Sequence, residues 1–240
     1  MVDIKTVEIL NCGATVGDCS IPDGATAWAS FICDMYWIDS VFLDSAADVV
    51  DSPELVTGNG LEIPDEVEGG AVEVLGTIAE RLRECEGTFV FEFELYSTAS
   101  PVGFIWMEQN TGETPISGFS LETWQLAVPP TKVFADEWDD TGGDTREMAA
   151  LYEPALGVGI HKIAITRTNA KLAVSVDGGA VVTAITGTHG WGHGDRLDRV
   201  TIGGRWFDGA PDWSKGGFYY RAITHYPEQS DGALVTLSTV

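Results

Sequence analysis

The stretch KLAVSVDGGAVVTAITG, residues 171–187, decides the fold class. Side chains in a strand alternate between its two faces, so one face of the first run carries Leu172, Val174 and Val176. In the turn segment DGG, residues 177–179, Gly178 and Gly179 tolerate the positive φ of a tight two-residue turn. The second run, residues 181–186, is rich in β-branched side chains that suit a pleated sheet. The stretch therefore predicts a β-hairpin.

A period of two continues through most of the chain from residue 87 onward. In TFVFEFEL, residues 88–95, phenylalanines alternate with Val90, Glu92 and Glu94, which is typical of a half-buried strand. Further short strands are predicted over VGFIWMEQ, FSLETWQLAV, IHKIAITRT, RVTIGG and GFYYRAITHY. Many short strands separated by turn residues favour an antiparallel β-sandwich or barrel.

Helical spacing is clearest over residues 71–85, which predict a structural helix that covers the end of a sheet. Residues 1–51 differ from the rest of the chain, and we interpret them as an N-terminal extension ahead of a domain over 52–240. The extension contains an aromatic, apolar stretch from Ala27 to Leu43, which is expected to pack on the main domain or to dock on a partner chain.

Composition excludes several partners. The chain has 240 residues, enough for a large core, and a formal net charge of −24. Such a surface repels phosphate backbones and anionic membranes, so nucleic acid is not an expected partner. The first residues do not resemble a signal peptide, and no apolar run is long enough to cross a membrane, which predicts a soluble protein without membrane insertion.

Four cysteines, at positions 12, 19, 33 and 85, are too sparse for a disulfide-built scaffold. No pair has the CxxC spacing of a zinc or redox site. A bridge between Cys12 and Cys19 is conceivable, and buried free thiols are the default expectation.

The order of elements in the second half resembles a known family. HKIAITRTNAKLAVSVDGG, RVTIGGRWFDG and GGFYYRAITHYPEQSDGALVTLS together resemble the second half of a concanavalin-like jelly roll of the laminin-G-like kind. Similar C-terminal ends occur in phage virion proteins, whose closing strand carries an arginine like Arg221. Physical reasoning agrees at the C-terminus, where Ser230 can cap a short helix that places Leu234 and Leu237 on the sheet.

The resemblance implies a non-enzymatic virion component of a tail or capsid. In that role residues 1–51 would contact other virion proteins or a second copy of the chain, and the domain would bind a host glycan or receptor. The alternative is a carbohydrate-active enzyme or a carbohydrate-binding module of the same fold, because this fold does not fix an activity. Glu92 and Glu94 share a face and can line a groove, but the spacing of paired catalytic carboxylates on this fold is missing.

Two sites are predicted from the loops. Exposed tryptophans can stack on sugar rings while polar neighbours orient the hydroxyls. This predicts a glycan site at Trp191, Trp213, His189, His193 and Asp212, with Trp206 in the core. His189 and His193 are also competent metal ligands, but they are too few for a metal centre. The acidic segment ADEWDDTGGDTRE, read as a loop, is the candidate calcium site, with ligands Asp136, Asp139, Asp140 and Asp144.

Overall fold

The structure is a computed structural model. It describes residues 19–33, 35–38, 41–43, 55–56, 58–63, 72–83, 87–98, 103–110, 115–124, 132–139, 145–152, 156–168, 171–184, 199–207, 210–214 and 217–240. Within these residues the chain is mostly antiparallel β with two short helices, as the sequence predicts. No helix in the described part of the chain is long and apolar enough to span a membrane.

The larger sheet has ten strands among the described residues, in the order β14-β13-β12-β7-β18-β1-β2-β3, with β5 also paired to β18 and β4 to β5. Its strands are β1 (Ala27–Ser30), β2 (Met35–Ile38), β3 (Val41–Leu43), β4 (Leu55–Val56), β5 (Gly60–Ile63), β7 (Gly87–Leu95), β12 (Gly159–Thr168), β13 (Lys171–Val176), β14 (Val182–Ala184) and β18 (Phe218–Tyr226). All of these pairings are antiparallel.

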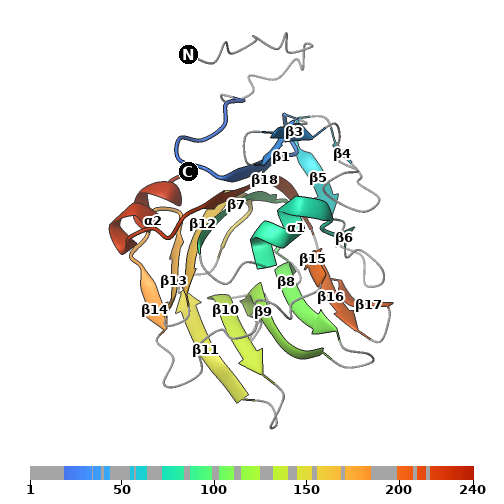
Figure 1. The fold of residues 1–240 in the computed structure, drawn as a ribbon, viewed down its shortest axis with the longest axis vertical. Helices are drawn as coiled ribbons and strands as arrows, with labels where there is room; N and C mark the ends of the chain where they lie inside the picture. Colours follow the sequence, from blue (N-terminus) through green and yellow to red (C-terminus); the bar gives the residue numbers. More distant parts are fainter. Residues whose placement is uncertain are drawn as a thin grey trace.

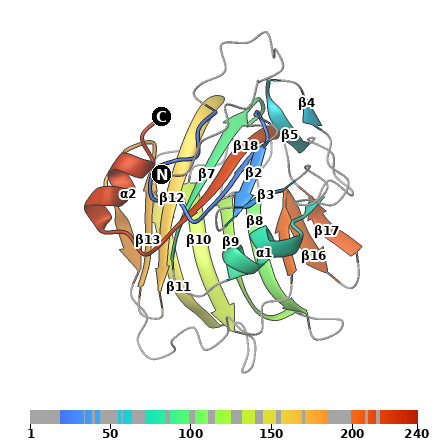
Figure 2. The same ribbon diagram turned by 45° about the horizontal axis from the view of Figure 1, so that its top comes forward.

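The second sheet has six described strands in the order β11-β10-β9-β8-β15-β6. They are β6 (Val72–Glu73), β8 (Gly103–Asn110), β9 (Pro115–Trp124), β10 (Lys132–Asp139), β11 (Thr145–Tyr152) and β15 (Arg199–Ile202). A separate two-stranded ribbon is formed by β16 (Gly204–Phe207) and β17 (Ala210–Ser214). The sheets form two layers, and helix α1 (Gly76–Arg83) packs against β1 of one and β15 of the other (Figures 1 and 2).

The core lies between the two sheets. The phenylalanines of β7 that the alternating pattern placed on one face are all buried, and Phe93 contacts Phe104 of β8 with 4.2 Å between ring centroids. The opposite face of the larger sheet is partly covered by α2 (Asp231–Leu237), at the left of Figure 1. Leu234 of α2 packs there against Val90 and Ala164, and Ser230 caps the helix as predicted, its Oγ accepting from the Ala233 N–H.

The predicted hairpin is confirmed, with a one-residue shift in its turn. The positive φ values fall on Asp177 (49°) and Gly178 (72°), and the N–H of Gly179 donates to the Val176 carbonyl. Asp177 tolerates this conformation because its carboxylate is tied down: Oδ1 accepts from the backbone N–H of Lys162. The Gly178 N–H donates to Ser238 Oγ, so the end of α2 holds the turn.

Three other sequence-based expectations are corrected by the structure. The helix predicted over 71–85 is shorter, because residues 72–73 pair with β15 as β6. Residues 136–139, expected in a loop, belong to β10, whose pairing with β9 and β11 overrides the local turn signal. The cysteine expectation was also wrong, since Cys19 and Cys33 form a disulfide with 5.9 Å between their Cα atoms.

The aromatic stretch of the N-terminal extension is integral to the sandwich. Strand β1 pairs with β18 along its whole length, and β2 and β3 continue the sheet. Ala29, Phe31 and Tyr36 are buried in the main core. Of the two outcomes considered for Ala27 to Leu43, packing on the main domain is the one observed, so a separable docking segment does not include these strands.

Candidate binding groove

A groove with a volume of about 380 Å³ lies on the outer face of the larger sheet. Its floor is formed by β1, β7, β12 and β18, and its walls by α2 and the segment before β1. Polar and aromatic residues that line the groove include Trp28, Ser30, Glu92, Lys162, Arg221 and Tyr226. This volume is at the lower end of the range of about 300–1,000 Å³ found for small-molecule sites.

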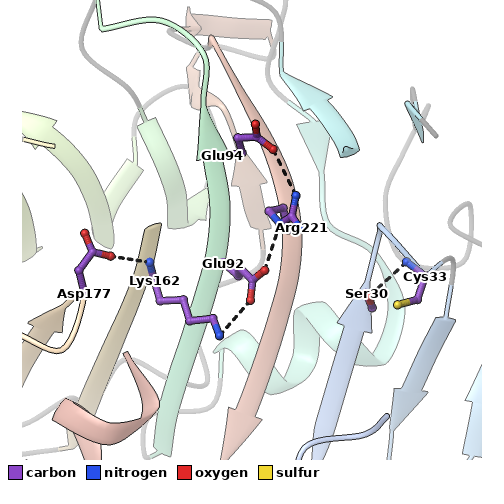
Figure 3. A network of polar contacts seen from close by, with 7 residues as sticks. All are labelled: Ser30, Cys33, Glu92, Glu94, Lys162, Asp177 and Arg221. Carbon is purple, nitrogen blue, oxygen red and sulfur yellow. Dashed lines mark hydrogen bonds and ion pairs between the residues drawn. The ribbon is translucent and has the colours of Figure 1, made fainter. Parts of the chain in front are cut away.

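A row of alternating charges lies on the outer face of the larger sheet, and three of its four side chains, Lys162, Glu92 and Arg221, line the groove (Figure 3). Lys162 Nζ lies 3.2 Å from Glu92 Oε2, and Arg221 Nε donates to Glu92 Oε1 at 3.0 Å. Arg221 Nη1 donates to Glu94 Oε2 at 3.2 Å, so one arginine holds two carboxylates. These four side chains are 16–36% exposed, which leaves their polar ends accessible from the groove.

Arg221 lies at a β-bulge in β18. Tyr220 pairs with Phe93 and Ala222 with Glu92, so Arg221 is the extra residue in its strand. Tyr220 is buried in the core, whereas Arg221 and Ala222 both line the groove, which means that the bulge interrupts the alternation of faces. Without the extra residue, Arg221 would not share a face with Ala222. Arg221 faces outward by alternation from Tyr220, and the bulge adds Ala222 to the same face, opposite Glu92.

The wall nearest β1 is fixed by the Cys19–Cys33 disulfide. The bridge ties the segment before β1, which contributes Ser20 and Pro22 to the groove, to the turn after β1. The N–H of Cys33 also donates to Ser30 Oγ at 3.3 Å (Figure 3). Because Trp28 of β1 is only 5% exposed, the floor beneath this wall is rigidly packed.

The opposite end of the row is supported by Asp177 and His161. Asp177 Oδ2 lies 2.7 Å from His161 Nδ1, and the Gly157 carbonyl lies 2.8 Å from Nε2. Both ring nitrogens thus face acceptors, an arrangement that suits the doubly protonated ring. Burial lowers the pKa of His161, but the hydrogen bond to Asp177, the Gly157 carbonyl and the Asp177 charge together raise it above its ordinary value.

The arrangement is suited to binding through hydrogen bonds. Both oxygens of Glu92 accept from cations, and Arg221 Nη2 has no bond to a described residue, so it can donate to a ligand. A hydroxyl group both donates and accepts, and can therefore join such a row at any point. Among the described residues no group of three or more His, Cys, Asp or Glu side chains is placed to hold a metal ion.

Most of the site residues predicted from the sequence cannot be placed. His189, Trp191, His193, Asp140 and Asp144 lie outside the described residues. Asp212 and Trp213 lie in β17, and Trp206 in β16, a ribbon where loops had been expected. Asp136 and Asp139 lie in β10. The glycan site at the tryptophans and the calcium site therefore stay predictions.

The groove contains residues that sequence reasoning noticed in part. Glu92 and Glu94 were assigned to one face from their spacing, and Arg221 from the resemblance of the closing strand. Lys162 and Trp28 were missed. The alternation in β12 places Lys162 on the same face as Ala164, so its outward direction could have been predicted. Its contact with Glu92 could not, because nothing in the sequence indicates that β12 pairs with β7.

Comparisons with known proteins identify the fold. No family model matches the sequence, and no curated protein matches it. The sialidase carbohydrate-binding module CBM40 of Ruminococcus gnavus, solved with α2,3-sialyllactose, is 16% identical, with a TM-score of 0.57 over 75% of this chain and 97% of the module. A leech intramolecular trans-sialidase is 16% identical with a TM-score of 0.59, over 74% of this chain but 27% of the enzyme.

A third similar structure is domain 4 of an extracellular GH43 arabinanase from Geobacillus stearothermophilus, solved with arabinotriose. It is 11% identical, with a TM-score of 0.54 over 90% of this chain and 98% of that domain. At such identities the likeness concerns the fold and not the activity. The chain thus has the β-sandwich fold of the jelly-roll, concanavalin-like type that the sequence predicts.

Proposed function

We propose that the chain is a carbohydrate-binding module that holds a glycan in the groove and performs no chemistry on it. The observation that carries this proposal is the accessible row Lys162–Glu92–Arg221 on the floor of the groove, which Glu94 extends beyond the groove by its ion pair with Arg221. Ion-paired side chains of this kind offer donors and acceptors in fixed positions, which is how a protein orients the hydroxyls of a sugar.

Two further observations support the proposal. Two of the similar structures are binding domains solved with a glycan, one with sialyllactose and one with arabinotriose. The Cys19–Cys33 disulfide suits an oxidising environment, where glycans of cell surfaces and of plant material are found. This function is the alternative that the sequence left open. The virion role stays a prediction, supported by the sequence resemblance alone, which is strongest over residues 158–240.

A glycan array with the purified chain, followed by calorimetric titration of the strongest ligand, tests the proposal. Arg221→Gln removes the central donor and is expected to weaken binding at least tenfold, since a hydrogen bond to a charged group contributes roughly 1.5–3 kcal/mol. Arg199→Gln is the matched control, because Arg199 pairs with Glu73 on the other sheet. Thermal melting of both variants checks that each is folded.

Three results would overturn the proposal. Absence of binding to any glycan of the array would remove the function itself. Loss of binding in Trp191→Ala together with full binding in Arg221→Gln would move the site from the groove to the predicted tryptophan site. Equal losses in Arg221→Gln and Arg199→Gln would show that net charge, rather than the groove, governs binding.

A further inference from the structure

An exposed aromatic and apolar patch adjoins the charged row at one end of the groove. Tyr96 is 40% exposed and Ile160 is 40% exposed, and the ring of half-buried Tyr219 lies 5.0 Å from that of Tyr96 between centroids. We call Tyr96, Tyr219 and Ile160 the aromatic platform. None of the three lines the groove as described above.

The strand register places the platform next to the groove. Glu94 pairs with Ile160 of β12 on one side and with Tyr219 of β18 on the other. Glu94 also binds Arg221, which lines the groove. Two residues of a strand span about 7 Å, so the row of Glu94 lies about that far from the row of Glu92. Ile160 and Tyr219 therefore flank Glu94, and the platform continues the outer face in the strand direction beyond Glu92.

The exposure of these side chains needs an explanation. Tyr96 follows Leu95 at the end of β7, and Val158, which is 67% exposed, precedes the Gly159 that pairs with Leu95. Among the described residues, three of the five exposed large hydrophobic side chains, Tyr96, Val158 and Ile160, thus lie beside one pair of strand ends, while Val41 and Val240 lie elsewhere. Concentrated apolar surface rimmed by polar groups marks a binding site. Tyrosine rings can present a face to the C–H groups of a sugar. The hydroxyl of Tyr96 donates to the Ile63 carbonyl at 3.4 Å, which holds its ring in place.

The charges of the groove favour a neutral ligand. Two cations, Lys162 and Arg221, are balanced by two carboxylates, and both oxygens of Glu92 are already engaged. An anionic sugar would have to displace Glu92 from its partners and leave a carboxylate that is only 22% exposed without them. The net charge of −24 also repels anions at longer range. Neutral hydroxyls join the row without breaking any pair.

We infer that the ligand is a neutral oligosaccharide that runs along the strands from the groove onto the aromatic platform, with one sugar over the charged row and another stacked on Tyr219 and Tyr96. This inference rests on the proposed function and specifies its substrate class. Two predictions can be tested separately. Affinity should rise with the length of the oligosaccharide, because the platform is a second subsite, and a negative charge on the ligand should lower affinity.

The length statement is tested with arabinose, arabinobiose and arabinotriose, and with the corresponding length series of the strongest neutral ligand found on the array. Affinity is expected to rise as the chain reaches the platform. Tyr219→Ala should remove that gain, a loss of about tenfold for the trisaccharide with little change for the monosaccharide, whereas Tyr219→Phe keeps the ring and should bind like the wild type. Val41→Ala, an apolar truncation on β3 at the other end of the larger sheet, is the second control.

The charge statement is tested with lactose against 3′-sialyllactose, which differ by one anionic sugar. Tighter binding of sialyllactose, or an array on which only anionic glycans bind, would overturn the inference while leaving the proposed function intact. Equal affinities of Tyr219→Ala and wild type for every chain length would overturn the second subsite. Absence of all glycan binding would instead contradict the proposed function, so the two failures are distinguishable.

Discussion

Removal of the Cys19–Cys33 disulfide gives a prediction whose magnitude follows from the structure. The bridge joins residues 14 positions apart and therefore closes a loop of about 15 residues in the unfolded chain. In the chain-entropy account, opening such a loop lowers the free energy of unfolding by about 3 kcal/mol. For a chain of this size that corresponds to a fall in melting temperature of roughly 6–12 °C.

The double variant Cys19→Ser, Cys33→Ser should nevertheless remain folded. Strand β1 keeps its pairing with β18, and Phe31, beside the bridge, stays buried in the core. The wall of the groove, however, loses its tether, because Ser20 and Pro22 lie between the bridge and β1. Glycan affinity is therefore expected to fall together with stability in this variant.

Urea unfolding with and without dithiothreitol measures the effect. Reductant should lower the midpoint of the wild type to that of the double variant and should leave the double variant unchanged. A wild type whose midpoint does not respond to dithiothreitol, and equals that of the double variant, would refute the reasoning, because the bridge would then contribute nothing to stability.

Two further predictions concern stability. The raised pKa of His161 means that its interaction with Asp177 stabilises the fold fully below pH 6.5 and is lost as the pH rises through the folded-state pKa. Urea unfolding should therefore show that His161→Gln lowers the free energy of unfolding by roughly 1 kcal/mol at pH 5.5 and by less at pH 9. A loss of stability that does not depend on pH would contradict this prediction. Deletion of residues 1–43 removes β1, β2 and β3 with their buried side chains, so the truncated chain should lack a cooperative melting transition. A native near-ultraviolet circular dichroism spectrum of the truncated chain would show instead that the N-terminal segment is separable.

Local interactions explain what the sequence predicted correctly. The alternation of Phe89, Phe91 and Phe93 with polar residues is a property of one strand, and the cap at Ser230 involves residues three positions apart. The hairpin over 171–184 likewise joins neighbouring segments through a tight turn. Elements of this kind are readable because neighbours in sequence supply most of the interactions that form them.

The groove depends on contacts between distant segments, which is why the sequence did not reveal it. Strand β7 lies between β12 and β18, so the charged row combines residues about 60 to 130 positions apart along the chain. The bulge at Arg221 exists only through pairing with β7, and a single strand shows no sign of it. The local preference for a turn near Asp139 is outweighed by the pairing of β10 with β9 on one side and with β11 on the other.

The sequence by itself therefore determined the class of fold, through side-chain periodicity, and a net charge of −24 that disfavours anionic partners. Tertiary structure alone decided that Cys33 pairs with Cys19, that the aromatic N-terminal stretch belongs to the main sheet, and that Arg221 meets Glu92 and Glu94. The physical reason is the same in each case. Strand pairing and burial are decided by which distant surfaces best satisfy one another, and no local pattern encodes that choice.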